Sequence, residues 1–212
     1  AIRRQRQMCI RDRDDSMQCE SLSLEGVQVQ KMQIVSKKMK KLLIKTCNLP
    51  DEYTINTPNL QTLGLKETYV KKLQYGKMDK LKYLSLGLNV IQNGKEKASP
   101  VTVLDLQKSK NIAELSVTGC RINKLDLSPT NKTLRLVSIT QSGKYPIKQV
   151  RLGKMAALKG LSVSAKCASI DVSKCSRLNT LECASYGIFK VKLPKSVQYL
   201  TLTSLCLLYT SD

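Results

Sequence analysis

The sequence contains no histidine and no tryptophan, and Phe189 is its only phenylalanine. The absence of histidine excludes Ser-His-Asp and Cys-His catalysis and removes the commonest neutral metal ligand. Because aromatic residues are scarce, the interior of the protein must consist mainly of Leu, Val, Ile and Cys. No apolar run approaches the roughly 20 residues that a membrane helix needs. Membrane insertion is therefore not expected.

Basic residues dominate the charge of this 212-residue chain, which carries 36 Lys and Arg against 16 Asp and Glu and a formal net charge of +20. The length is sufficient for one domain with a substantial core or for two small ones. Such a charge is typical of proteins that bind nucleic acid or anionic surfaces. The positions of the lysines must decide between these partners and a solvated surface.

The two ends of the chain share an unusual relation at the level of DNA. The C-terminal CLLYTSD can be encoded by a DNA string whose reverse complement, in another frame, spells the QMCIRD of residues 7–12. This relation is expected if both ends are translations of one inverted sequencing adapter. We therefore expect residues 1–13 and 205–212 to be adapter-derived, as in a fusion scar. The credible domain is then 19–204, an internal fragment in which a missing signal peptide carries no information.

The main pattern of the sequence is a repeat of the form L-x-x-L-x-L-x-x-[N/C/T]-x-L, which recurs about every 20 residues. The clearest unit is IAELSVTGCRINKLDL, from Ile112 to Leu127. Nine units begin at Cys19, Met39, Leu60, Leu81, Ile112, Leu134, Leu158, Leu178 and Val197. The long spacing after Leu81 indicates a surface excursion at QNGKEKASP (residues 92–100), and SGKYP (142–146) indicates a shorter one.

A second short strand is expected in each unit, with its middle residue facing outward. In this interpretation Asp171 lies between the inward-facing Ile170 and Val172. The equivalent positions are Gln74, Asp105, Asp126, Arg151, Asp171 and Lys192. We expect the last four to form an exposed column of alternating charge. Asp105 and Asp126 could alternatively be a catalytic carboxylate pair, but no nucleophile or pocket-forming insertion accompanies them.

The stretches SVTGCRINKLDLS, SIDVSKCSRLNTLEC and NLQTLGL resemble the short leucine-rich repeats of bacterial surface and secreted proteins, of the internalin-like and Bacteroidetes types. The position after the first strand is occupied irregularly in this chain, by Cys47, Thr68, Asn89, Cys120 and Tyr186. The resemblance implies a mostly β fold of the leucine-rich repeat superfamily. This fold is a curved, right-handed solenoid of about nine repeats with a parallel sheet on its concave side. The resemblance also implies export and a role as an adhesin or binding scaffold.

The outward residues of the first strands form the concave face, which is the usual binding surface of such a solenoid. Small hydroxyl residues dominate these positions, as suits a closely stacked sheet. Tyrosine and glutamate combine contact area with a polar tip or a charge, so they are the stronger candidates for binding. The predicted ligand-binding residues are Tyr83, Glu114, Ser116, Ser138, Glu182 and Tyr199.

Lysine is expected mainly away from this face, with Lys41, Lys45 and Lys66 near it in the first units only. The turns and the opposite side carry Lys31, Lys37, Lys38, Lys71, Lys72, Lys124, Lys190, Lys192 and Lys195. A nucleic-acid groove would line its contact face with basic and stacking aromatic residues, so this distribution argues against nucleic acid. A solvated basic surface is favoured, and it also suits anionic cell-wall or polysaccharide surfaces.

The cysteines outside the end segments occupy packing positions. Cys47 and Cys120 lie three units apart, about 14 Å at one strand spacing per unit, whereas a disulfide needs Cα atoms within about 7 Å. Cys19 and Cys183 are expected to be small buried hydrophobes. Cys167, Cys175 and Cys183 lack Cys-x-x-Cys spacing, so no zinc site is expected. Whether Cys167 and Cys175 meet across a turn stays open.

Taken together, the sequence predicts a non-enzymatic scaffold that binds a protein or a cell-surface glycan, needs no cofactor or metal, and is secreted or located at the cell surface. A cytosolic scaffold for protein–protein interactions is the first alternative. A nucleic-acid binder that uses the lysine-rich back is the second, and it would show steep salt dependence.

Overall fold

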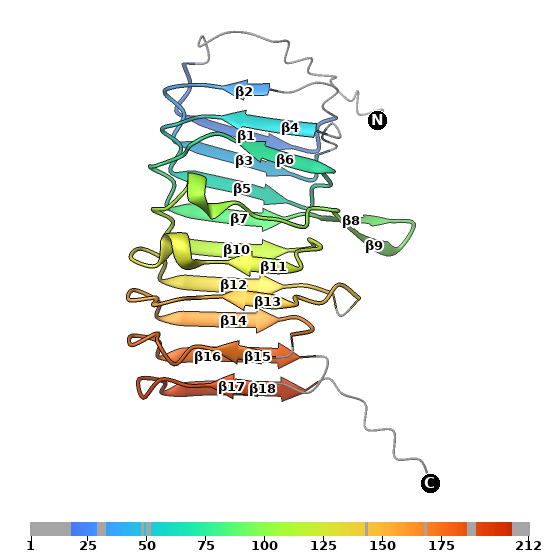
Figure 1. Cartoon of the computed structure of the whole chain (residues 1–212). Helices are drawn as coiled ribbons and strands as arrows, with labels where there is room; N and C mark the ends of the chain where they lie inside the picture. The colour runs from blue at the N-terminus through green and yellow to red at the C-terminus, as the bar shows by residue number, and fades with distance from the viewer. Residues whose placement is uncertain are drawn as a thin grey trace.

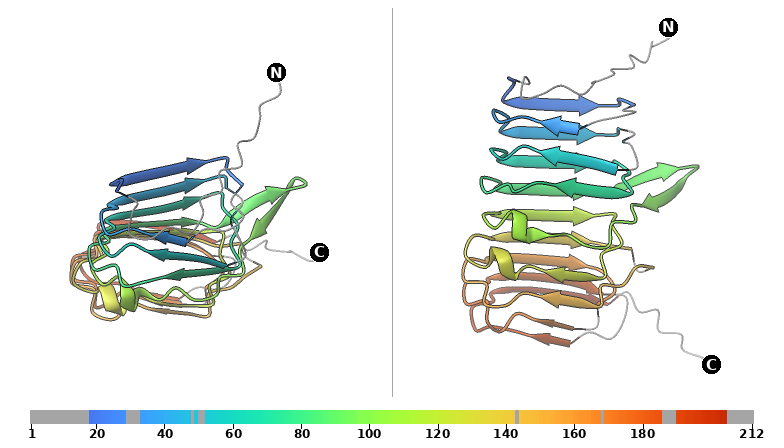
Figure 2. Two further views of the ribbon diagram at one scale, coloured as in Figure 1. Left: turned by 90° about the horizontal axis from the view of Figure 1, so that it is seen from above. Right: turned by 45° about the horizontal axis from the view of Figure 1, so that its top comes forward.

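The computed structural model describes residues 18–28, 33–47, 49, 52–142, 144–167, 169–185 and 190–204. The two segments that we expect to be adapter-derived, and also Lys31 and Tyr186, lie outside the described residues. The chain forms a mostly β, parallel solenoid of about eight turns, which confirms the predicted fold class. Each coil runs forward in one layer and back in another, as the two views of Figure 2 show.

The front layer is one parallel sheet of nine strands, in which each strand pairs with the strand of the next coil (Figure 1). Every predicted unit begins two residues before one of these strands, so the predicted register is confirmed. The strands are β1 (Ser21–Glu25), β3 (Lys41–Lys45), β5 (Thr62–Lys66), β7 (Tyr83–Gly87), β10 (Glu114–Thr118), β12 (Leu136–Thr140), β14 (Gly160–Ser164), β16 (Thr180–Ser185) and β18 (Tyr199–Ser204).

The return layer is less regular than the front sheet. Its strands form one sheet of three and two separate pairs, and two short 3-10 helices lie among them. The sheet contains β2 (Gln33–Val35), β4 (Glu52–Asn56) and β6 (Lys72–Tyr75). The two pairs are β11 (Lys124–Asp126) with β13 (Gln149–Arg151) and β15 (Ser169–Asp171) with β17 (Lys190–Lys192). The helices are η1 (Leu106–Lys108) and η2 (Ser128–Thr130).

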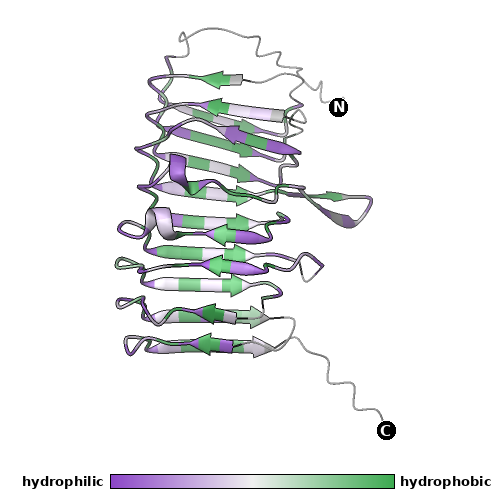
Figure 3. Ribbon diagram, in the orientation of Figure 1, coloured by the Kyte–Doolittle hydropathy of each residue, from purple (hydrophilic) through white to green (hydrophobic). Residues whose placement is uncertain are grey.

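The core lies between the two layers and consists of columns of aliphatic side chains, one from each coil. Figure 3 shows the alternation of hydrophobic and polar residues along the front strands. Leu84, Leu115 and Leu161 are each 2% exposed, and they occupy the same position in their coils. Cys183 is 3% exposed and pairs in register with Val163. Its predicted role as a small core residue is therefore confirmed.

The coils are also joined by backbone hydrogen bonds at the turn that precedes each front strand. The amide of Arg135 donates to the carbonyl of Ala113, and the amide of Lys159 donates to the carbonyl of Arg135, over 2.7 and 2.8 Å between N and O. The same bond recurs in each pair of neighbouring coils from Glu20 to Gln198. It fixes one turn directly above the next.

The position that varies between cysteine and threonine has a single local function. The Sγ of Cys47 donates to the carbonyl of Lys45 over 3.2 Å, and Thr68 Oγ1 donates to the carbonyl of Lys66 over 2.8 Å. Cys47 and Thr68 are 2% and 0% exposed. Each of these carbonyls also accepts a hydrogen bond from a backbone amide of the preceding coil, Gly26 N for Lys45 and Thr46 N for Lys66. Either a cysteine or a threonine can therefore occupy this position without disturbing the fold.

The excursion predicted after Leu81 is an antiparallel hairpin, formed by β8 (Asn89–Gln92) and β9 (Lys95–Ala98), that projects from the body (Figure 2). Its two turn residues, Asn93 and Gly94, have φ angles of 52° and 70°. Two consecutive positive φ angles are typical of the tight turn that suits the twist of a hairpin. The hairpin begins one residue after Leu88, which is completely buried.

The first predicted unit differs from expectation, because Cys19 is exposed and not buried. Cys19 opens the first described coil, where no preceding coil covers it among the described residues. The last coil shows the same effect: Leu200 and Leu202 are 44% and 54% exposed although they occupy core columns. The repeat pattern alone does not distinguish a central coil from one at the end of the stack.

Replacing Leu115 with alanine should destabilise the protein by about 2–5 kcal/mol, because it leaves a cavity inside the stack. Leu136 on the neighbouring strand is the matched control, since its side chain is 48% exposed on the outer face. Its replacement by alanine should cost less than about 1 kcal/mol. Equal losses in denaturant unfolding would contradict the assignment of the two faces.

Buried thiols should be protected from alkylation at neutral pH. Burial raises the pKa of both Cys120 and Cys183 to about 12, so each thiol stays protonated and a poor nucleophile. Residue-resolved mass spectrometry should find Cys19 modified quickly and Cys120 and Cys183 only after denaturant is added. Equal rates in the native protein would contradict the burial of these columns.

Candidate functional site

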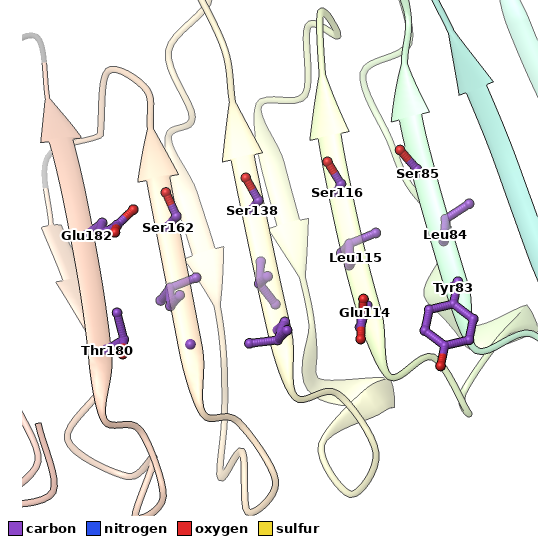
Figure 4. A pocket seen from close by; sticks show the side chains of 14 residues that line it. Tyr83, Leu84, Ser85, Glu114, Leu115, Ser116, Ser138, Ser162, Thr180 and Glu182 are labelled. Carbon is purple, nitrogen blue, oxygen red and sulfur yellow. The ribbon is translucent and has the colours of Figure 1, made fainter. Parts of the chain in front are cut away.

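Side chains alternate between the two faces of a strand. Each coil therefore places the residues at the same positions of its repeat on the outer face of the front sheet. Ser85, Ser116, Ser138 and Ser162 are in register on four consecutive strands, β7, β10, β12 and β14. Figure 4 shows their hydroxyl groups in a row. Glu182 continues this row on β16.

A groove of about 360 Å³ runs across these five strands. Five of the six predicted binding residues line it: Tyr83, Glu114, Ser116, Ser138 and Glu182. The side chains of Tyr83 and Glu114 lie at the same edge of the groove, which follows from their pairing across β7 and β10 (Figure 4). The sixth residue, Tyr199, is on β18 and is not part of the lining.

Leu136 is a groove residue that the sequence interpretation missed. It is 48% exposed, and it occupies the position that holds Tyr83 and Glu114 in the preceding coils. A Cβ atom at the neighbouring Gly160 would lie 2.9 Å from Leu136 Cδ2, so Leu136 extends over the glycine. The signal in the sequence is a leucine in an outward position that faces a glycine one coil later.

The charge of the groove is opposite to that of the whole chain. Glu114 and Glu182 are its only charged lining residues among those the structure describes, and both are exposed. The predicted placement of Lys41, Lys45 and Lys66 near the first units is confirmed, since they lie on β3 and β5, outside the groove. Electrostatics in the groove therefore favours neutral or cationic groups over anionic ones.

An ion pair occupies part of the outer face in the first coils. Lys45 Nζ lies 2.6 Å from Glu25 Oε1, across β1 and β3. This contact lowers the pKa of Glu25 and raises that of Lys45, first through the hydrogen bond and then through the charges. Both side chains are exposed, so the pair neutralises local charge but contributes little to stability.

The predicted column of alternating charge is only partly correct. Asp126 pairs with Arg151 at 3.9 Å and Asp171 with Lys192 at 3.7 Å, but β13 and β15 belong to different sheets, so the column is not continuous. Asp105 does not lie in a strand at all. Its carboxylate caps η1 by accepting a hydrogen bond from the amide of Gln107 over 3.0 Å.

The aspartates are held by the serine two residues later. Asp126 Oδ1 accepts hydrogen bonds from the amide and the hydroxyl of Ser128 over 2.9 and 2.6 Å. Asp171 makes the same two contacts with Ser173, over 3.1 and 2.6 Å. This local turn, rather than a ladder between coils, explains the repeated Asp-x-Ser of the sequence.

The described lysines that the sequence predicts on the turns and the opposite side lie outside the groove. Lys72, Lys124, Lys190 and Lys192 are on the return strands and exposed.

Within the described ranges, no three Cys, Asp or Glu residues gather as a metal-binding group, and the described cysteines are free thiols. No helix in the described part of the chain is long and apolar enough to span a membrane.

Comparison of the chain with family models, with curated proteins and with solved structures gives no match. The resemblance to leucine-rich repeat proteins therefore stays a hypothesis that rests on the repeat pattern.

Replacing Ser173 with alanine should raise the pKa of Asp171 toward its ordinary value. The Ser173 hydroxyl is the largest cause of the lowered pKa, ahead of its amide and of Lys192. Because the folded-state pKa is lowered, the associated stability is present above the ordinary pKa and is lost as the pH falls through the folded value. NMR titration of the carboxyl carbon would measure the shift. A larger rise in the control Lys192→Gln would contradict the turn as the main cause.

Proposed function

We propose that the protein is a non-enzymatic binding scaffold whose groove recognises a segment of another protein or a glycan. The observation that carries the proposal is the groove on the front sheet, where Tyr83 and Leu136 offer exposed apolar area beside two carboxylates. A large surface of this kind on a rigid sheet costs little ordering entropy when a ligand binds.

The lining chemistry supports such a ligand. The row of serine hydroxyls offers both donors and acceptors at strand spacing, about 4.8 Å. Tyr83 provides an aromatic face with a polar tip, which suits either a sugar ring or an apolar side chain. Glu114 and Glu182 can accept hydrogen bonds from sugar hydroxyls or pair with Lys and Arg of a protein ligand.

The repeat pattern supports the proposal that the protein is related to the short leucine-rich repeat proteins of bacteria. Its leucine positions are the buried columns of the solenoid; Leu60, Leu81, Leu134, Leu158 and Leu178 are all 0% exposed. By that resemblance we propose a secreted or cell-surface protein with an adhesin-like role. The alternative is a cytosolic scaffold for protein–protein interactions, and the free thiols of the described cysteines, which occupy packing positions, fit either redox compartment.

The test is to probe peptide and glycan arrays with the labelled protein and with the double variant Tyr83→Ser, Glu114→Gln. Wild type should retain specific spots, and the double variant should lose about tenfold or more in affinity for them, since it removes one aromatic anchor and one charge. The identity of the retained spots decides between a peptide and a glycan.

The matched control is Ile91→Ser with Glu67→Gln, which changes one exposed apolar residue and one carboxylate away from the groove. The control should bind as wild type does. Absence of specific spots, or equal losses in the two double variants, would overturn the proposed role of the groove.

A further inference from the structure

One edge of the solenoid concentrates positive charge. It consists of the six turns that lead from the return layer into the front strands β7 to β18, residues 76–82, 106–113, 127–135, 152–159, 172–179 and 193–198. These turns lie on the left in Figure 1. Each contains at least one exposed Lys or Arg, and Asp79 is their single acidic residue. We name this surface the basic edge.

Cations of the basic edge recur in all six turns, and some of them lie in register on neighbouring coils. The ladder of backbone hydrogen bonds places Arg135 directly beside Lys159 in the next coil. Lys82 lies one coil before Ala113 in the same column. Lys154, in the same turn as Lys159, and Lys174, in the next turn, occupy equivalent positions, four residues before Leu158 and Leu178. Neighbouring coils are about 4.8 Å apart, so the edge presents cations in every coil, although the ladder column itself also contains the neutral Ala113, Asn179 and Gln198.

Few of these charges are neutralised by the protein itself. Within the described residues, the one ion pair of the basic edge joins Lys77 to Asp79 over 2.9 Å. The return strands differ, because Arg151 and Lys192 each pair with an aspartate of the adjacent strand. Like charges in register on neighbouring strands repel. An anionic ligand along the basic edge would relieve this repulsion.

We infer that the basic edge binds a linear acidic polysaccharide that lies along the solenoid axis, with one or two cations per coil facing its carboxylate or sulfate groups. The coil spacing is similar to the length of one sugar unit in an extended polysaccharide. The six turns contain no aromatic residue for base stacking, and Arg135 and Arg177 are their only arginines. Nucleic-acid surfaces rely on stacking and on arginine, so these features favour a polysaccharide.

This site is separate from the groove of the proposed function and goes beyond it. None of the cations of the basic edge lines the groove. The two surfaces meet where Lys82 precedes Tyr83 and Arg135 precedes Leu136. Because the cations do not line the groove, a polysaccharide that contacts only these cations would leave the groove lining free for its own ligand. Loss of binding at either surface can be measured without change at the other.

The experiment measures binding of the full chain to polygalacturonate at low ionic strength, with neutral dextran, a single-stranded DNA of equal charge, and phosphatidylserine vesicles as comparison probes. The edge variant is Lys132→Gln, Lys159→Gln, Lys174→Gln, taken from three consecutive turns. The control variant is Lys124→Gln, Lys148→Gln, Lys190→Gln, which removes the same charge from exposed positions outside these turns.

Polygalacturonate should bind, added salt should weaken the binding, and dextran should not bind. The edge variant should lose about tenfold in affinity, as expected for three exposed charge contacts, and the control variant less than about twofold. Equal losses would show that net charge alone acts, and would overturn the inference. Absence of binding would also overturn it, as would tighter, edge-dependent binding of the DNA or the vesicles.

Discussion

Every coil of this protein depends on its neighbours to bury its aliphatic side chains. Leu181 is completely buried where β18 follows it, whereas Leu200, in the same column of the last coil, is 44% exposed. The stability of such a stack is approximately a sum of coil and interface contributions. The hydrophobic columns therefore determine which sequences the solenoid tolerates, and the outward positions are free to vary. The groove and the basic edge lie at those outward positions and in the turns.

Because this constraint recurs in each coil, the sequence predicts the front sheet almost completely. A buried leucine such as Leu60 or Leu158 opens five of the nine units, and the strand begins two residues after the opening residue in all nine coils. The return layer is predicted less well, since its strands are short and its turns differ in length. Asp105 illustrates the difference: the repeat pattern predicts a strand position, but its carboxylate accepts a hydrogen bond from the amide of Gln107 and caps η1.

The candidate groove could be predicted in part, for a related reason. The strand period identifies the outward positions, and tyrosine or glutamate at such positions, as at Tyr83 and Glu114, is conspicuous among serines. Leucine is not conspicuous, because the same residue fills the core. Leu136 can be recognised as exposed only when its strand register is known and when Gly160 beside it is seen to leave space. The exposure of Cys19 was missed because periodicity carries no information about where the stack of described coils ends.

Each coil contributes to three kinds of surface, because residues at the same position of the repeat form a column along the solenoid axis. Outward strand positions form the groove with Glu114 and Glu182. The return strands carry aspartates paired with Arg151 and Lys192. The turns of the basic edge carry an excess of cations over the single Asp79. A substitution in one column changes one surface at a fixed place and leaves the others in register. The formal charge of +20 is thus not a uniform property of the molecule. A large part of it lies on the basic edge, whose six turns contain twelve Lys and Arg residues against the single Asp79, whereas the charged residues that line the groove, among those described, are two glutamates.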